Sequence, residues 1–155
     1  MGLAAISAGI LLFRRGEQGI EALLVHPGGP FWAKKDLGAW SIPKGEVEEG
    51  EEPPVCALRE LEEELGSRLS ISVEELIELG SVRQKSGKVV HCWAVERDFD
   101  PATLRSNTFA MEWPPRSGEQ REFPEVDRAG WFGPEDARRK IISAQAAFLD
   151  RLEAR

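Results

Sequence analysis

The segment GEVEEGEEPPVCALRELEEELG, residues 45–66, constrains the fold more than any other part of the sequence. Pro53 and Pro54 suit the first turn of a helix, where a missing N–H costs nothing, and Gly66 suits the helix end. At about 100° per residue, leucines share one face of this helix and glutamates the roughly opposite face: Leu58, Leu61 and Leu65 against Glu60, Glu63 and Glu64. The segment therefore predicts a helix that packs on a core and gathers three carboxylates on one surface.

The gathered carboxylates need a physical reason. Like charges at i,i+3 and i,i+4 spacing destabilise a helix by roughly a few tenths of a kcal/mol per pair, so another interaction should hold them together. A divalent cation would do so, and hard carboxylate oxygens favour magnesium or manganese over zinc or copper. The alternative is a solvated acidic face, which is the common role of a Glu-rich helix.

Composition limits the function classes. A chain of 155 residues is long enough to bury about two thirds of its unfolded surface, so we expect one domain over 1–155. Hydrophobic residues make up 41% and charged residues 30%, which is typical of a globular protein. The formal net charge of -7 argues against binding a nucleic-acid polymer, because such binding relies on Lys and Arg. A phosphate ligand would need local bases or metal.

The N-terminal apolar run, from Leu3 to Phe13, is too short to span a bilayer, and its basic pair follows it, unlike the order in a signal peptide. We interpret it as a buried strand and expect no membrane association. Cys56 and Cys92 lack CxxC spacing, so neither a disulfide framework nor a zinc site is predicted. These features favour a cytoplasmic protein.

Several segments predict strands. The apolar segments 7–13 and 20–26 flank a turn-forming RRGEQG and should pair. Segments 75–84 and 88–99 should pair through a tight turn at Ser86 and Gly87, and 107–113 can form another strand. The sheet is then mixed or antiparallel.

The remaining segments predict a loop and a second helix. Residues 27–40, PGGPFWAKKDLGAW, combine Pro, Gly, Lys and aromatics, which is typical of a long functional loop. A helix should begin at Gly133 and Pro134, with apolar residues recurring down one face: Ile141, Ala144, Phe148 and Leu152. The order of elements favours an α/β fold with the sheet between helices.

The spacing of residues 45–67 resembles the Nudix box, G-x5-E-x7-R-E-U-x-E-E-x-G-U, where U is aliphatic. The matching residues are Gly45, Glu51, Arg59, Glu60, Leu61, Glu63, Glu64 and Gly66. Chance agreement at the identity positions is on the order of one in a million per start, so the spacing outweighs the solvated-face interpretation. Ser67 departs from the final aliphatic position, which affects a packing contact.

The resemblance implies a Nudix-type α/β/α sandwich with a mixed sheet, which hydrolyses a nucleoside diphosphate linked to another group by water attack. It implies Mg²⁺ or Mn²⁺, with more than one ion, held by Glu60, Glu63, Glu64 and the Gly45 carbonyl. Arg59 and Glu51 would form an ion pair that orients the loop against the helix.

A general base can lie beyond the box in this family. In segment 118–132, Glu122 and Glu125 are our candidates, with an ordinary surface charge as the alternative for each. Clustered carboxylates with bound metal would neutralise phosphate charge and position the water, and such a glutamate would remove its proton.

The lead-in to the box, Trp40 to Gly45, reads W-x-x-P-K-G and resembles Nudix enzymes acting on diadenosine tetraphosphate and inositol pyrophosphates. It also resembles a bacterial subgroup described as predicted NTP pyrophosphohydrolases. We predict a small-molecule nucleotide substrate, bound by a monomer or homodimer. The predicted substrate-binding residues are Lys44, Trp40, Lys34, Lys35 and Phe31, with Trp32, Trp113 and Arg116 as further candidates. Core packing is the alternative for the tryptophans.

Three alternatives stay open at this point. One is a non-catalytic nucleotide-sensing module, although degenerate members usually lose box carboxylates and this chain keeps them. Another is a Nudix enzyme acting on ADP-ribose, an oxidised dNTP or an inositol pyrophosphate. The isopentenyl diphosphate isomerase branch would need a catalytic cysteine, and Cys92 lies in an ordinary predicted strand. We interpret Cys56 as a buried thiol near the metal ligands, and His91 as a residue on the solvent side of its strand.

Overall fold

The first strand, β1 (Ile6–Gly16), forms the centre of the molecule in the computed structural model, which describes residues 5–17 and 19–155. Ile10 and Leu12 pack into one hydrophobic cluster, whereas Leu11 and Phe13 pack into another on the opposite face. A strand buried on both faces needs a continuous apolar run, which is the pattern in the sequence. The predicted buried strand is confirmed from Ile6 onward, and its first two residues, 3 and 4, lie outside the described residues.

The main sheet is mixed, as predicted. It contains β2 (Gly19–Pro27), β4 (Ile77–Arg83), β5 (Val89–Glu96) and β8 (Val126–Phe132) in the order β4-β5-β1-β2-β8, and the short β3 (Lys44–Glu46) also pairs with β1. The β1–β5 pairing is parallel and the other pairings are antiparallel. The predicted partners of residues 7–13 and 75–84 are both confirmed.

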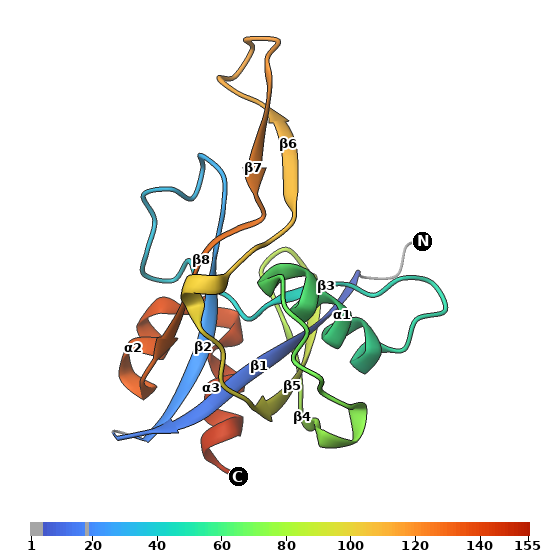
Figure 1. The fold of residues 1–155 in the computed structure, drawn as a ribbon, viewed down its shortest axis with the longest axis vertical. Helices are drawn as coiled ribbons and strands as arrows, with labels where there is room; N and C mark the ends of the chain where they lie inside the picture. Colours follow the sequence, from blue (N-terminus) through green and yellow to red (C-terminus); the bar gives the residue numbers. More distant parts are fainter. Residues whose placement is uncertain (1–4, 18) are drawn as a thin grey trace.

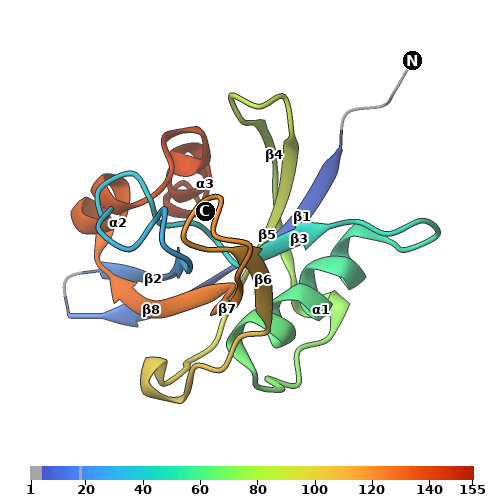
Figure 2. The same cartoon turned by 90° about the horizontal axis from the view of Figure 1, so that it is seen from above.

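Helices cover both faces of this sheet, as Figures 1 and 2 show. α1 (Pro53–Leu65) packs on the face of β1 that carries Ile10, and α3 (Ala146–Glu153) packs on the face that carries Leu11. The predicted α/β/α sandwich is therefore confirmed.

The bounds of α1 match the prediction. Pro53 and Pro54 occupy its first turn. Its buried residues are Cys56, Ala57, Leu61 and Leu65. Gly66 caps the helix with φ 72°, a left-handed conformation that glycine adopts without the steric cost of a Cβ, and its N–H donates to the Glu62 carbonyl oxygen at 2.8 Å. The leucine face therefore fixes the orientation of the glutamates.

The predicted second helix is wrong in its continuity. α2 (Pro134–Lys140) ends before Ile141, a 3₁₀ turn (Ser143–Gln145) follows, and only then does α3 begin. The break occurs because Trp40 pairs with this stretch: its N–H donates to the Lys140 carbonyl at 2.9 Å, and its carbonyl accepts from the Ile142 N–H at 2.7 Å. Ile141, Phe148 and Leu152 are still buried in one cluster. The apolar pattern therefore predicted which residues are buried, but not that the helix is divided.

A separate hairpin projects from the sandwich at the top of Figure 1. It consists of β6 (Thr108–Glu112) and β7 (Gln120–Pro124), which pair only with each other. The strand predicted at 107–113 is thus present as β6, but outside the main sheet. The predicted loop 27–40 is confirmed as turns and lies beside the hairpin, where Phe31 meets Trp113 edge-on with ring centroids 5.7 Å apart. Over the described residues, the chain contains no helix with the length and apolar character needed to cross a membrane.

Candidate functional site

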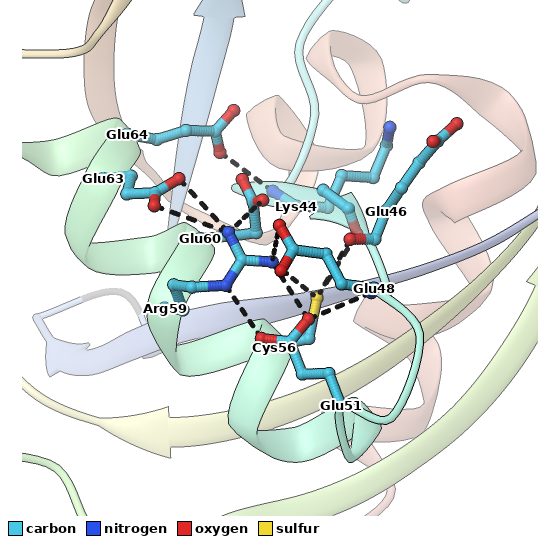
Figure 3. Close-up of polar contacts among 10 residues, drawn as sticks. Lys44, Glu46, Glu48, Glu51, Cys56, Arg59, Glu60, Glu63 and Glu64 are labelled. Atoms are coloured by element: carbon cyan, nitrogen blue, oxygen red, sulfur yellow. Dashed lines mark hydrogen bonds and ion pairs between the residues drawn. The ribbon is translucent and has the colours of Figure 1, made fainter.

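Arg59 lies at the centre of the acidic surface of α1 (Figure 3). Its Nε and Nη2 donate to the two carboxylate oxygens of Glu51 at 2.8 and 3.0 Å. Its Nη1 donates to Glu60 at 3.0 Å and to Glu63 at 3.4 Å. The hydrogen bonds from Arg59 lower the pKa of Glu51 to about 2, and those with Glu51 raise the pKa of Arg59. The ion pair expected from the sequence resemblance is present and ties the loop before α1 to the helix.

The carboxylate of Glu60 packs directly against the backbone of Gly45. A Cβ at Gly45 would lie 2.0 Å from the carboxylate carbon of Glu60 and 2.2 Å from its Oε1. Any side chain at position 45 would therefore displace that carboxylate. The predicted metal ligands Gly45 and Glu60 are adjacent because β3 runs directly beside α1.

Glu64 points from α1 toward the backbone of Lys44, whose N–H donates to its Oε2 at 2.9 Å (Figure 3). Burial raises the pKa of Glu64 to about 8, and repulsion from Glu60 adds to the shift, while the Lys44 N–H opposes it. Burial also raises the pKa of Glu60. The same burial lowers the pKa of Lys44, with repulsion from Lys88 as the next cause. These groups share a poorly solvated region in which burial disfavours the charged form of each side chain.

The carboxylates do not form a closed cage in the present arrangement. Within residues 5–17 and 19–155, no three His, Cys, Asp or Glu side chains are close enough together to hold a metal ion. Glu60 and Glu63 turn toward Arg59, and Glu64 turns toward the Lys44 amide. Carboxylates that repel one another are expected to take separate donors. The donor set is nevertheless entirely oxygen, which fits magnesium or manganese, and the glycine that admits Glu60 is in place.

A cavity of about 180 Å³ begins where Glu64 and Lys44 meet. Its lining includes Lys44, Glu64, Glu125, Trp32, Ser41 and Ile42. Glu125 contributes from the turn between β7 and β8, and its charge contributes to the raised pKa of both Glu60 and Glu64. Three chain segments far apart in sequence therefore bring carboxylates, a lysine and an indole ring to one cavity.

The other predicted site residues lie in three places: on the hairpin outside the cavity, in the hydrophobic core, and on the exposed loop 27–40. Glu122 is exposed on β7 and does not line this cavity, so the structure separates it from Glu125. Trp40 is only 5% exposed and packs edge-on against His26 and Phe132. The core-packing alternative therefore describes Trp40 better than the predicted substrate contact does.

Phe31, Lys34 and Lys35 are exposed on loop 27–40. Lys35 holds its ammonium 5.0 Å from the ring centroid of Trp32, a cation–π contact at the mouth of the cavity. These residues are free to meet a ligand that extends out of the cavity.

Sequence reasoning missed two buried polar residues at the site. Gln145 is fully buried; its Oε1 accepts from the Ile42 N–H at 3.0 Å, and its Nε2 donates to Ser41 Oγ at 3.0 Å. It therefore fixes the segment that leads into Gly45. His26 is also fully buried, beneath loop 27–40. His26 lies between a valine and a proline, and Gln145 lies between two alanines; this interruption of an apolar run is the signal in the sequence that marks each of them.

The two cysteines and His91 take their expected roles. Cys56 is fully buried against the Gly45 and Glu46 carbonyls, and burial raises its pKa to about 11. Cys92 is buried within β5. His91 is partly exposed, bonds Glu78 at 2.7 Å and stacks on Trp93.

Comparisons with known proteins agree with this architecture. The NUDIX domain family matches residues 4–152. The RNA pyrophosphohydrolase of Rhodospirillum rubrum is 34% identical over 61 residues, an alignment that covers 37% of this chain and 37% of that protein.

Solved structures show the same fold at low identity. An Ap4A hydrolase of C. elegans is 23% identical with a TM-score of 0.63 and 96% of each chain covered. The NUDIX domain of Shewanella oneidensis NrtR, complexed with ADP ribose, is 16% identical with a TM-score of 0.67, and covers 99% of this chain and 89% of its own. Because the family match spans nearly the whole sequence, the chain belongs to the Nudix family.

Proposed function

We propose that this protein is a metal-dependent pyrophosphohydrolase that cleaves a phosphoanhydride bond of a nucleoside polyphosphate or dinucleoside polyphosphate by water attack. The observation that carries the proposal is the meeting of Glu64, Lys44 and Glu125 at one cavity, next to Glu60. Acidic groups beside a lysine suit a substrate that brings both metal and phosphate.

Gly45, Glu60, Glu63 and Glu64 would hold Mg²⁺ or Mn²⁺. When bound, such ions neutralise phosphate charge and make a water molecule easier to deprotonate. The Arg59–Glu51 pair would keep α1 and the preceding loop in fixed relation, since both carboxylate oxygens of Glu51 are held by one guanidinium.

Glu125 is the better candidate for removing the proton from water. It lines the cavity with Glu64, whereas Glu122 is exposed on β7 outside it. Lys44 would contact the phosphates, because it lines the same cavity as Glu64 and Glu125. Both roles require side chains that reach the cavity, Glu125 to contact the attacking water and Lys44 to contact the phosphates.

The substrate class is inferred from the lead-in and the dimensions of the site. A cavity of about 180 Å³ holds a base or a short phosphate chain but not a whole dinucleotide, so the rest of a dinucleoside polyphosphate would extend over the exposed loop with Phe31, Lys34 and Lys35. The W-x-x-P-K-G lead-in, which resembles that of enzymes acting on diadenosine tetraphosphate, supports this class, and the fold is shared with an Ap4A hydrolase.

The test is phosphate-coupled turnover with a panel of dinucleoside polyphosphates, nucleoside triphosphates including oxidised ones, ADP-ribose and inositol pyrophosphates. Each is assayed with magnesium, with manganese and with EDTA. We expect metal-dependent hydrolysis with a preference for dinucleoside polyphosphates. Tight nucleotide binding without product in saturating metal would instead favour the sensing module.

A further inference from the structure

Glu125 is a single residue between two strands: β7 ends at Pro124 and β8 begins at Val126. Its side chain is exposed at the cavity that it lines with Glu64, so its direction depends on how the backbone is held. Val126 is only 4% exposed and packs in the cluster that contains the leucines of α1. This buried valine anchors the chain on one side of Glu125, and the backbone contacts of the turn determine where the carboxylate lies.

Two other segments bind the backbone at this turn. The N–H of Gly28, just after β2, donates to the Glu125 carbonyl oxygen at 3.0 Å, and the Glu125 N–H donates to the Asn107 carbonyl oxygen at 2.8 Å. The Ser106 hydroxyl accepts from the Val126 N–H at 3.1 Å. It also lies within donating distance of two carbonyl oxygens, that of Val126 at 3.0 Å and that of Asn107 at 2.9 Å. Glu125 is therefore held through both of its backbone groups, and the residue after it is held by one hydroxyl.

Gly28 is buried, and the same turn closes the space beside it. A Cβ at position 28 would lie 1.9 Å from the Pro124 carbonyl oxygen, far inside van der Waals contact. This obstacle is backbone, so it cannot rotate away as the end of a flexible side chain would. An alanine at position 28 would therefore displace Pro124, and Glu125 with it.

We propose that Ser106 and Gly28 are positioning residues: they hold the backbone around Glu125 so that its exposed carboxylate faces the reacting water, and they affect the rate of hydrolysis only through Glu125. The proposal rests on the function proposed above, in which Glu125 removes the proton from water. A general base acts only within hydrogen-bond reach of that proton, and a misplacement of about 1 Å can cost on the order of a hundredfold in rate. Ser106 and Gly28 thus serve the chemistry from outside the lining of the cavity.

The first test is amide hydrogen exchange, measured by NMR on metal-free protein without substrate. In Ser106→Ala the Val126 N–H loses its acceptor, so the Val126 and Glu125 amides should exchange on the order of tenfold faster than in the wild type. The matched control is Ser117→Ala, which removes a hydroxyl that accepts from the Glu119 N–H at 3.1 Å in the same hairpin. It should leave both amides unchanged. Unchanged exchange in Ser106→Ala would overturn the proposal whether or not the protein is a hydrolase.

The second test is a double-mutant comparison of kcat and KM on diadenosine tetraphosphate with magnesium. Ser106→Ala should lower kcat roughly tenfold, with KM within about twofold of the wild type. Gly28→Ala should lower kcat further, up to the loss caused by Glu125→Gln, because its Cβ displaces the turn itself. In the Glu125→Gln background neither change should lower kcat again, since the group that they position is gone.

A merely structural role predicts a different pattern, in which the losses in kcat multiply in the double variants. That result would overturn the proposal, and Ser106→Ala alone is sufficient for the comparison if Gly28→Ala does not fold. Ser117→Ala should keep wild-type kcat in both backgrounds. If Glu125→Gln itself keeps wild-type kcat, the general base of the proposed function is wrong and the effect on rate falls with it, whereas the exchange measurement still tells whether Ser106 holds this turn.

Discussion

The cavity is bounded by two regions of different construction. On one, the glutamates of α1 are fixed by a regular helix and by one arginine that bonds three carboxylates. On the other, loop 27–40 presents exposed aromatics and lysines and is held by backbone turns and by His26. The comparison suggests that reaction chemistry depends on the rigid helix, whereas substrate choice depends on the loop, where side chains can change without disturbing the core.

The largest effect should follow a change on the helix. Glu63→Gln or Glu64→Gln keeps the side-chain shape but removes a negative metal ligand, so kcat should fall roughly a thousandfold with the fold intact. Steady-state turnover with magnesium measures kcat, and circular dichroism shows whether the fold is intact. Glu62→Gln, on the same helix but outside the lining of the cavity, is the matched control and should keep near wild-type activity. A wild-type rate in Glu63→Gln or Glu64→Gln would show that the metal assignment is wrong.

The next effect separates two glutamates close in sequence. Glu125→Gln should lower kcat about a hundredfold if Glu125 removes the proton from water, because general base catalysis contributes roughly 10²–10⁴-fold. Glu122→Gln should stay within about twofold of wild type, since Glu122 lies outside the cavity. The pH–rate profile of each variant is the measurement. The reverse ranking would place the hairpin, rather than the turn after it, at the reacting water.

The buried Glu64 on α1 should also make the stability of the metal-free protein depend on pH. Folding raises the pKa of Glu64 from 4.5 to about 8, so between these values the folded chain binds a proton that the unfolded chain has released. This contribution to stability is present below pH 4.5 and is lost as pH rises to 8. The lowered pKa of Glu51 acts in the opposite direction and below this window.

Thermal melts in EDTA from pH 5 to 8 test this point. Because Gln stays neutral, Glu64→Gln should become progressively more stable than the wild type as pH rises, and a saturating metal should reverse the order at pH 8. A difference in Tm that does not change with pH would show that Glu64 is solvated in the metal-free protein.

The same contrast explains how much could be predicted from the sequence. α1 was predictable to its ends because its signals are local: two prolines, a leucine periodicity and a terminal glycine. The division of the C-terminal helix at Ile141 was not, since it results from pairing with Trp40, a hundred residues earlier in the chain. The choice between Glu122 and Glu125 depended on where β7 ends, and β7 exists only because it pairs with β6. His26 was hidden for a related reason: both its partners lie in other segments.

The smallest effect should come from the exposed loop. Phe31 is 62% exposed and touches Trp113 of the hairpin, whereas Leu37, at 59%, is equally exposed in the same loop but has no ring to stack. If Phe31 supports a second base, Phe31→Ala should raise KM for a dinucleoside polyphosphate about two- to tenfold with kcat unchanged, because aromatic contacts contribute roughly 0.5–1.5 kcal/mol. Leu37→Ala should change neither constant. The two variants are compared by KM and kcat on a dinucleoside polyphosphate and on the matching triphosphate, and only the first substrate should distinguish them. A fall in kcat at constant KM in Phe31→Ala would mean that the loop takes part in positioning the reacting groups, and the division between a chemical helix and a recognition loop would no longer hold.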